Sequence, residues 1–451
     1  MLYCDITTSF CNCISGSKLS GILRTELMLA RELNLLYPAV CFIALKDDCF
    51  YLLDKESLKH ILGSGDIDDA FAKTKNLLLK NLFKEEAKNV FENDRRRQIS
   101  EGFWLLCSAL PGLSQKAFVH FGQYIEKKTT GLHFFRNDTP FSENDVVFSA
   151  GSGGHGVFID RELIKEKKRK GFHWCQVIYD MTTVLLPQVH EKNTIIHQEH
   201  YFQYAFSISD IVFYGGKTCM EDSERYMQGK GFPKHIAIPI KLGDNIAKPE
   251  HTCDDDGSVL HELGVYGPYI LTVGTIEARK NHETLYKAYL LLLSSTNGIP
   301  PQLVIAGRPG WKTEEFLDTL SRDERVRGKI IILSPSDVQL DVLYRNCLFT
   351  VLASQYEGWS LTLPESYGYG KFCLTADVQP LREISQDLAE YIHPFDTVKW
   401  ANRIMYYASH NNELKSWEAK IASKWKSTTW HDCAACIIRN IRKHYPFETP
   451  D

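Results

Sequence analysis

The chain has 451 residues, well above the usual size of one domain, so more than one hydrophobic core is expected. Apolar residues make up 44 % and charged residues 24 %, an ordinary globular composition that excludes extensive disorder. The formal net charge of −4 excludes a general affinity for nucleic acid, because such binding needs a strongly basic face to neutralise phosphates.

The N-terminus lacks the basic start and apolar run of a secretory signal, and no later stretch is long and apolar enough to span a membrane. These features predict a cytoplasmic protein. The 13 cysteines are scattered, mostly in apolar runs, which favours reduced thiols over a disulfide framework. We expect no metal at Cys433 and Cys436, because no second Cys or His pair follows at zinc-finger spacing.

Short apolar runs alternate with longer segments of helical period, which is typical of parallel sheets joined by crossover helices. The predicted fold class is therefore α/β. In the first half, strands are predicted at 2–7, 39–44, 145–150, 175–179 and 211–214, and helices at 19–36 and 199–209. A polar stretch at 245–259 is the best candidate for a linker, and we interpret its aspartates at 254–256 as solvated linker residues.

The second half repeats this rhythm and predicts a second doubly wound sheet. Strands are expected at 269–273, 302–306, 329–333 and 348–352, and helices at 284–293, 314–321 and 338–346.

Two cations follow the first strand of the second half. Gly274 ends that strand, and Arg279 and Lys280 lie in the loop before the next helix. Nucleotide phosphates bind at such strand ends, where a following helix offers unpaired N–H groups and the positive end of its dipole. An isolated Arg-Lys pair is more often surface charge, so the pair needs a second motif beside it.

A pair of glutamates follows the strand at 348–352. Glu357 lies in the loop and Glu365 eight residues further on, near a predicted helix start. This spacing allows the amides of 358–362 to cradle a diphosphate and Glu365 to accept ribose hydroxyls, with Glu357 facing the transferred sugar. The bare spacing of two glutamates arises by chance in many helical proteins.

Taken together, residues 269–282 and 356–365 resemble the donor half of the retaining glycosyltransferases of family GT4. That resemblance implies a GT-B fold, with two Rossmann-like doubly wound domains facing a central cleft. It implies an acceptor-binding domain at 1–245, a donor-binding domain at 246–426, and a C-terminal helix at 427–451 that crosses back to the first domain.

The resemblance also assigns site residues. Glu357 and Glu365 match the family's E-x7-E motif, and Arg279 and Lys280 match the cations around the donor diphosphate, with Lys280 the better candidate for phosphate contact. Many relatives carry a second cation where this chain has Thr275. We predict Glu357, Lys280 and Arg279 as catalytic. The predicted donor-binding residues are Gly21, Gly274, Thr275, Arg308, Ser334, Gly358, Trp359, Ser360, Leu361, Thr362 and Glu365.

The first half resembles the same family in its opening, where 20–24 read Ser-Gly-Ile-Leu-Arg. Gly21 would let the backbone approach the β-phosphate, while Arg24 is either an acceptor contact or a structural cap. At Tyr179-Asp180 the family usually has His-Asp, with the His touching the transferred sugar, so that role is open here. The predicted acceptor-side residues are Arg24, Ser152, Gly153, Tyr179 and Asp180.

The segment Gly151–Gly156 matches the dinucleotide-binding pattern G-x-G-x-x-G. We interpret it as an acceptor-side loop, because it comes late in the chain and we expect no helix directly behind it. Two alternatives stay open. One is an NAD-linked nucleotide-sugar-modifying enzyme that uses this loop, and the other is a catalytically silent GT-B-like scaffold subunit, consistent with the departures at Tyr179 and Thr275.

The family resemblance implies a retaining hexosyltransferase that needs no metal or other cofactor, in which Lys280, Arg279 and helix-terminal amides stabilise the departing diphosphate. It suggests GDP-mannose as donor and a lipid-linked oligosaccharide as acceptor, in the synthesis of a bacterial surface polysaccharide such as O-antigen. The basic stretch at 164–174 and the helical region at 71–106 suit an anionic membrane surface on the cytoplasmic side. A solvated helix face explains the basic stretch equally well.

Overall fold

The structure is a computed structural model that describes residues 1–15, 21–46, 49–63, 70–71, 73–74, 139–152, 157–244, 255–295 and 298–447. The chain divides into two compact units. The first comprises 1–151, 155–172 and 448–451, and the second comprises 152–154 and 173–447. Within the described segments, no helix has both the length and the apolar character required to cross a membrane.

The first unit is built on a four-stranded arrangement in the order β3-β2-β1-β4. Strand β1 is parallel to β2 and β4, and β3 is antiparallel to β2. The strands are β1 (Leu2–Asp5), β2 (Cys41–Lys46), β3 (Cys49–Leu53) and β4 (Val146–Ser149). The helices are α1 (Thr7–Ser15), α2 (Gly21–Leu36), α3 (Lys59–Leu62) and α7 (Val157–Lys170).

A helix does begin behind the glycine-rich segment, so the expectation of none there is wrong. Helix α7 starts at Val157, and Ile159 and Leu163 are both buried. Because these two residues lie one helical turn apart, they present one apolar stripe to the core. Strand β4 is still not the first strand of its sheet, so the other objection to a dinucleotide fingerprint stands.

In the second unit, three parallel strands run in the order β5-β6-β7. Every residue of β6 is buried, as expected for a parallel strand covered on both faces. The strands are β5 (His173–Ile178), β6 (Ile211–Gly215) and β7 (Ile236–Ile240). The helices that follow β5 and β6 are α8 (Thr182–Leu185), η1 (Pro187–Val189), α9 (Lys192–Ile208) and α10 (Lys217–Met227).

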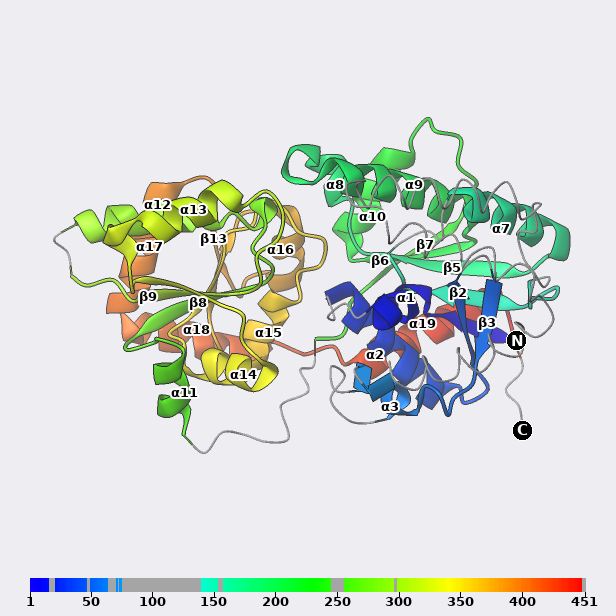
Figure 1. Cartoon of the computed structure of the whole chain (residues 1–451), viewed down its shortest axis with the longest axis horizontal. Helices are drawn as coiled ribbons and strands as arrows, with labels where there is room; N and C mark the ends of the chain where they lie inside the picture. Colours follow the sequence, from blue (N-terminus) through cyan, green and yellow to red (C-terminus); the bar gives the residue numbers. More distant parts are fainter. Residues whose placement is uncertain are drawn as a thin grey trace, which may run out of the picture. The chain divides into compact units, whose positions relative to one another are not determined.

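The same unit contains a six-stranded parallel sheet in the order β10-β9-β8-β11-β12-β13, with helices on both faces (Figure 1). The strands are β8 (Tyr269–Val273), β9 (Gln302–Ala306), β10 (Ile330–Leu333), β11 (Thr350–Leu352), β12 (Cys373–Ala376) and β13 (Glu390–Ile392). The winding reverses between β8 and β11. Ligands bind doubly wound sheets at the carboxyl ends of strands at such a reversal.

The helices around this sheet follow the same chain order. They are α11 (Asp256–Glu262), η2 (Ala278–Lys280), α12 (His282–Ser294), α13 (Glu314–Arg322), η3 (Glu324–Val326), α14 (Asp337–Asn346), α15 (Thr362–Gly368), α16 (Gln379–Ser385), α17 (Thr397–Ser409), α18 (Asn411–Lys424) and α19 (Trp430–His444).

Part of the expected linker is folded, so the interpretation of its aspartates as linker residues is wrong for two of them, although the Asp255 side chain is exposed to solvent. The Asp255 side chain caps α11 by accepting a hydrogen bond from the N–H of Gly257 at 3.0 Å. Asp256 pairs with the Arg345 guanidinium and accepts a hydrogen bond from the Asn346 amide at 2.9 Å. A carboxylate suits a helix start because it meets unpaired N–H groups and the positive end of the dipole.

Helix α19 packs beside strand β7. A Cβ added at Gly243 would lie 2.3 Å from the Trp430 ring, and the N–H of Asp244 donates to the carbonyl of Thr428 at 2.8 Å. Thr429 starts the helix with a capping box. The domain boundaries expected at 245 and 426 stay predictions, and the helical region expected at 71–106 lies almost wholly outside the described residues.

Candidate functional site

Two loops meet at the point where the sheet winding reverses. The first leaves β8 at Gly274 and contains η2, and the second follows β11. Asn281 closes the first loop in a left-handed conformation, with φ of 58°. Its side-chain amide donates to the carbonyls of Ala353 at 3.0 Å and Pro394 at 2.8 Å, which ties the loop to neighbouring strand ends.

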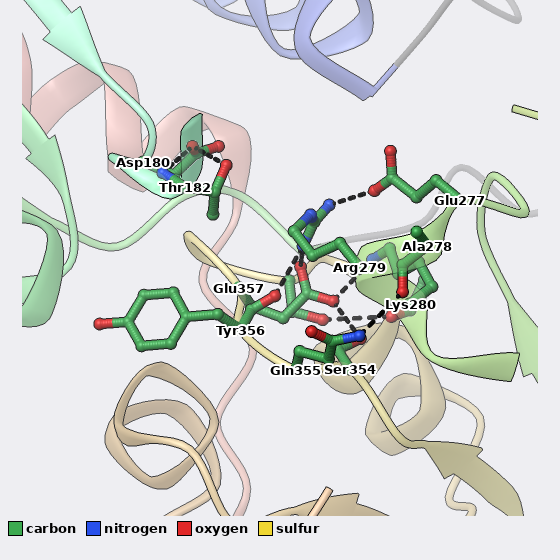
Figure 2. A network of polar contacts seen from close by, with 12 residues as sticks. Asp180, Thr182, Glu277, Ala278, Arg279, Lys280, Ser354, Gln355, Tyr356 and Glu357 are labelled. Carbon is green, nitrogen blue, oxygen red and sulfur yellow. Dashed lines mark hydrogen bonds and ion pairs between the residues drawn. The ribbon is translucent and has the colours of Figure 1, made fainter. Parts of the chain in front are cut away.

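The Glu357 carboxylate lies at the centre of this junction (Figure 2). Its Oε2 accepts a hydrogen bond from Arg279 Nη1 at 2.6 Å, and its Oε1 accepts from Lys280 Nζ at 2.7 Å and from Ser354 Oγ at 2.6 Å. Arg279 also donates to Glu277 at 2.5 Å. Only 3 % of Glu357 is exposed, so the loops are joined by a buried ion-pair cluster.

The charges of this cluster stabilise one another. Burial alone raises the pKa of Glu357, but the nearby Arg279 and Lys280 outweigh it and bring that pKa down to about 2. Burial lowers the pKa of Arg279, whereas Glu357 and Glu277 raise it above its ordinary value. Burial and then Lys280 lower the pKa of His282 to about 3, so this ring is neutral near pH 7.

The Lys280 ammonium is positioned to bind an anion at the end of β8. A Cβ added at Gly274 would lie 3.5 Å from Lys280 Cε and 3.8 Å from its Nζ, so the ammonium lies over the bare backbone there. A lysine ammonium carries three N–H donors, of which Glu357 accepts one. The arrangement can therefore hold and stabilise a phosphate-like group.

Other predicted donor-side residues surround this edge. Arg308 and Ser334 follow β9 and β10 and are exposed, and Thr275 is exposed beside Gly310. Glu365, in the first turn of α15, accepts a hydrogen bond from the Tyr344 hydroxyl at 3.0 Å.

The loop after Glu357 contacts the ends of β5 and β6. A Cβ added at Gly358 would lie 2.5 Å from both the Tyr179 carbonyl oxygen and Asp180 Cβ, so the two backbones are in close contact. The Trp359 ring would lie 3.1 Å from a Cβ at Gly216. The following residues lead into α15, where Ser360 has φ of 54°, Leu361 is the N-cap and Thr362 is the first helical residue.

The predicted acceptor-side residues are divided between the units. Asp180 accepts hydrogen bonds from the backbone N–H of Thr182 at 2.9 Å and from its hydroxyl at 2.6 Å. The Ser152 carbonyl accepts from the Gln198 amide at 3.2 Å. Arg24 lies in the first turn of α2 in the first unit, together with the predicted donor-side residue Gly21, and Gly153 lies outside the described residues.

Sequence reasoning missed several members of the site. Glu277 and Ser354 are buried partners of the cluster, and both lie within three residues of a predicted site residue, which is a usable local signal. Glu383 gave none. Its carboxylate accepts hydrogen bonds from the N–H groups of Lys217 at 2.6 Å and Thr218 at 2.8 Å, at a helix start 165 positions or more away in sequence.

Metal-ligating side chains do not gather in the part of the chain that the structure describes. No group of three or more His, Cys, Asp or Glu side chains there is arranged to hold a metal ion.

The sequence of the second half matches a known family model. Residues 262–424 match the model described as "Glycosyl transferases group 1". The serotype-specific mannosyltransferase WbdA of Escherichia coli is 22 % identical over 386 residues, covering 80 % of this chain and 45 % of that protein. The O-antigen chain mannosyltransferase B of Escherichia coli is 28 % identical over 171 residues, covering 38 % of this chain and 44 % of that protein. The chain thus spans about half the length of the curated relatives that it matches.

Two solved structures share the fold. The α,α-trehalose 6-phosphate synthase of Burkholderia multivorans has a TM-score of 0.53 at 10 % identity, covering 66 % of this chain and 70 % of that one. The Anabaena protein Alr3699/HepE, solved in complex with UDP, has a TM-score of 0.51 at 13 % identity, covering 66 % and 79 %. These similarities confirm the predicted fold class, a GT-B arrangement of two parallel-sheet α/β domains.

Proposed function

From the premise that residues 262–424 are a glycosyltransferase group 1 domain, we propose that this chain is a retaining hexosyltransferase. It moves a sugar from a nucleoside diphosphate donor to a glycan acceptor. The observation that carries the proposal is the buried contact of Arg279 and Lys280 with Glu357 at the reversal of the sheet winding, where doubly wound folds bind their ligands.

The proposed reaction requires stabilisation of the leaving diphosphate. The bond from the anomeric carbon to the diphosphate breaks with its electron pair on the phosphate oxygen, while the acceptor hydroxyl attacks from the same face and passes its proton to that departing oxygen. Lys280 and Arg279 meet the charge that develops on the diphosphate. One preorganised donor of this kind is worth about 3 kcal/mol at a transition state. These cations take the role of a metal, and the proposed reaction needs no Mg²⁺.

Glu357 serves this reaction by positioning the two cations. Three donors already hold its carboxylate, and its low pKa keeps it ionised. A carboxylate held in this way is a poor nucleophile toward the sugar, which supports same-face attack without a covalent intermediate.

The names of the relatives support the identity of the substrates. WbdA and mannosyltransferase B of Escherichia coli are named for mannose transfer, and the latter for the O-antigen chain. We therefore propose GDP-mannose as donor and a lipid-linked oligosaccharide of surface polysaccharide synthesis as acceptor.

A panel of nucleotide sugars tests the activity. Slow hydrolysis, and transfer to oligosaccharide acceptors, would be measured for each donor with EDTA and again with Mg²⁺. We expect turnover of GDP-mannose at similar rates in both. Hydrolysis of none of the donors, or tight binding of NAD without donor hydrolysis, would overturn the proposal, and dependence on Mg²⁺ would overturn its metal-free form.

A cytoplasmic, peripheral membrane location is part of the same proposal. The last turn of α7 contains four cations, Lys167, Lys168, Arg169 and Lys170. Flotation with anionic vesicles should carry the protein upward, and neutral vesicles should not. The double variant Lys168→Glu/Arg169→Glu should weaken flotation. Equal behaviour on both kinds of vesicle would contradict peripheral attachment through charge.

A further inference from the structure

His190 is a buried histidine whose ring is unsatisfied. It follows η1, is 4 % exposed, and neither ring nitrogen has a hydrogen-bond partner of ordinary geometry within the described part of the chain. Burial and the charges of Arg279 and Lys312 lower its pKa, while Asp180 and the backbone of Thr182 raise it. The ring is therefore a neutral imidazole close to the charged cluster.

Trp311 lies beside His190 and contributes a third unsatisfied nitrogen. The two ring centroids are 6.3 Å apart with the planes tilted by 34°, and the buried indole Nε1 of Trp311 also has no partner among the described residues. Lys312 Nζ donates to the carbonyl of Gln188 at 2.8 Å, which holds the two segments together. The two rings thus form a polar pair contributed by loops more than 100 residues apart.

The segment that contains Trp311 is fixed to the cation loop. The N–H of Ile276 donates to the carbonyl of Arg308 at 2.8 Å, and the N–H of Gly310 donates to the carbonyl of Ile276 at 2.7 Å. Glu277 comes next in the chain and pairs with Arg279. A continuous series of contacts therefore connects the ring pair to the proposed diphosphate site.

Unpaired buried donors and acceptors are costly. Each one destabilises a folded protein by roughly 1–3 kcal/mol, so a structure that retains several beside its functional site calls for an explanation. A neutral imidazole offers one donor and one acceptor, and an indole N–H offers one donor. That combination suits a sugar hydroxyl, which both donates and accepts. It does not suit a phosphate, which a cation would bind better.

We propose that His190 and Trp311 form the subsite for the transferred sugar, hydrogen-bonding hydroxyls of the hexosyl group while Arg279 and Lys280 hold the diphosphate. This inference rests on the proposed function. The proposed sugar contact, His190, lies in the segment between β5 and α9, eleven positions after Tyr179.

The test compares binding of a nucleoside diphosphate with binding of the nucleotide sugar that contains it. Dissociation constants for GDP and GDP-mannose would be measured on the full chain for the wild type, His190→Ala, His190→Gln and Trp311→Phe. His261→Ala, at an exposed histidine on α11, is the matched control. We expect His190→Ala to weaken GDP-mannose binding on the order of ten-fold with GDP binding unchanged. Trp311→Phe, which removes only the N–H, should have a smaller effect, and His190→Gln should recover part of the loss.

Deoxy donors give a second readout on the wild type itself. If a mannosyl hydroxyl contacts His190, the donor that lacks this hydroxyl binds the wild type more weakly but binds His190→Ala no more weakly than GDP-mannose does. This comparison identifies the hydroxyl. It remains informative even if one substitution prevents folding, because Trp311→Phe can replace His190→Ala.

Three outcomes would overturn the inference. His190→Ala could bind both ligands like the wild type, or it could lose GDP and GDP-mannose binding equally, which indicates a structural role. It could instead change only the KM for the acceptor, which would assign the ring pair to the acceptor sugar. By contrast, a wild-type protein that binds neither ligand would contradict the proposed function itself, so the two failures are distinguishable.

Discussion

The charged cluster around Glu357 and the ring pair His190–Trp311 are connected through the same loop, yet their buried polar atoms are satisfied to different degrees. Glu357 accepts three hydrogen bonds within 2.7 Å, and its charge is balanced by two cations. His190 and Trp311 have three buried nitrogens without a hydrogen-bond partner of ordinary geometry in the described chain. The charged cluster does contain one comparable atom, Arg279 Nε.

This difference shows where the fold provides its own partners and where it does not. A buried charge without a partner costs far more than a buried neutral ring, so the ionic groups must be paired before any ligand arrives. Neutral rings can be left unsatisfied at a tolerable cost and completed by a substrate. The first cluster is therefore preorganised by the protein, whereas we propose that the second is completed by the sugar.

Removing Lys280 should have the largest effect. Lys280→Ala takes away the proposed phosphate contact, and donor hydrolysis should fall by roughly 100–1000-fold while the far-ultraviolet circular dichroism spectrum is retained. The matched control is Lys287→Ala, at an exposed lysine of α12 that pairs with exposed Glu283, and it should hydrolyse donor at the wild-type rate. An active Lys280→Ala variant would remove Lys280 from the proposed site.

Neutralising Glu357 should be costly for stability and should depend on pH. Glu357→Gln removes the buried counter-charge of Lys280 and one of the two carboxylates that pair with Arg279, so the free energy of unfolding should fall by about 3 kcal/mol at pH 7. The folded pKa of about 2 is below the ordinary value of 4.5, so the stabilisation is complete above 4.5 and is lost as pH falls toward 2. Denaturant titrations should show the gap between the wild type and the variant closing over that range.

Glu283→Gln is the control for that series. Its carboxylate is exposed on α12, and the substitution should change stability little at any pH. A gap for Glu357→Gln that stays constant down to pH 2 would contradict the assignment of a low pKa to Glu357.

A methyl group at Gly358 should have an intermediate effect. Gly358→Ala places Cβ 2.5 Å from the Tyr179 carbonyl, so one backbone must move. The free energy of unfolding should therefore fall by roughly 1–3 kcal/mol, which thermal unfolding measures as a lower melting temperature. Gly368→Ala, at the end of α15 where nothing lies within 4 Å of the added carbon, is the matched control and should be neutral or slightly stabilising. Equal melting temperatures for the two variants would mean that the loop is not held against β5.

Replacing His190 with an apolar residue should affect stability least. His190→Leu removes two unpaired buried nitrogens, so the free energy of unfolding should stay the same or rise by about 1 kcal/mol, even as GDP-mannose binding weakens. Urea denaturation at pH 7 measures this. A loss as large as that of Glu357→Gln would show that the ring has a partner in the protein, and the contrast between the two clusters would fail.

Much of the architecture was readable from local pattern. Buried apolar runs with helical segments between them identified β8, β9, β10 and β11 to within a few residues, because each strand of a parallel sheet must be apolar on both faces. Strands β3, β7, β12 and β13 were missed, as was helix α1. The side chains of β3 from Phe50 to Leu53 are half-buried or exposed, and α1 contains several polar residues, so neither has the uniform apolar character of the central strands.

The sequence by itself determined which residues were eligible for the chemistry: Arg279 and Lys280 after one strand end, and Glu357 after another. Only the tertiary structure decided that these three groups touch, that Glu277 and Ser354 complete their pairing, and that Gly358 contacts Asp180. Hydrophobic period is a local property of the chain, and it places strands and strand ends. The pairing of buried charges and the unsatisfied rings of His190 and Trp311 depend on which distant loops are brought together, and no local spacing encodes that.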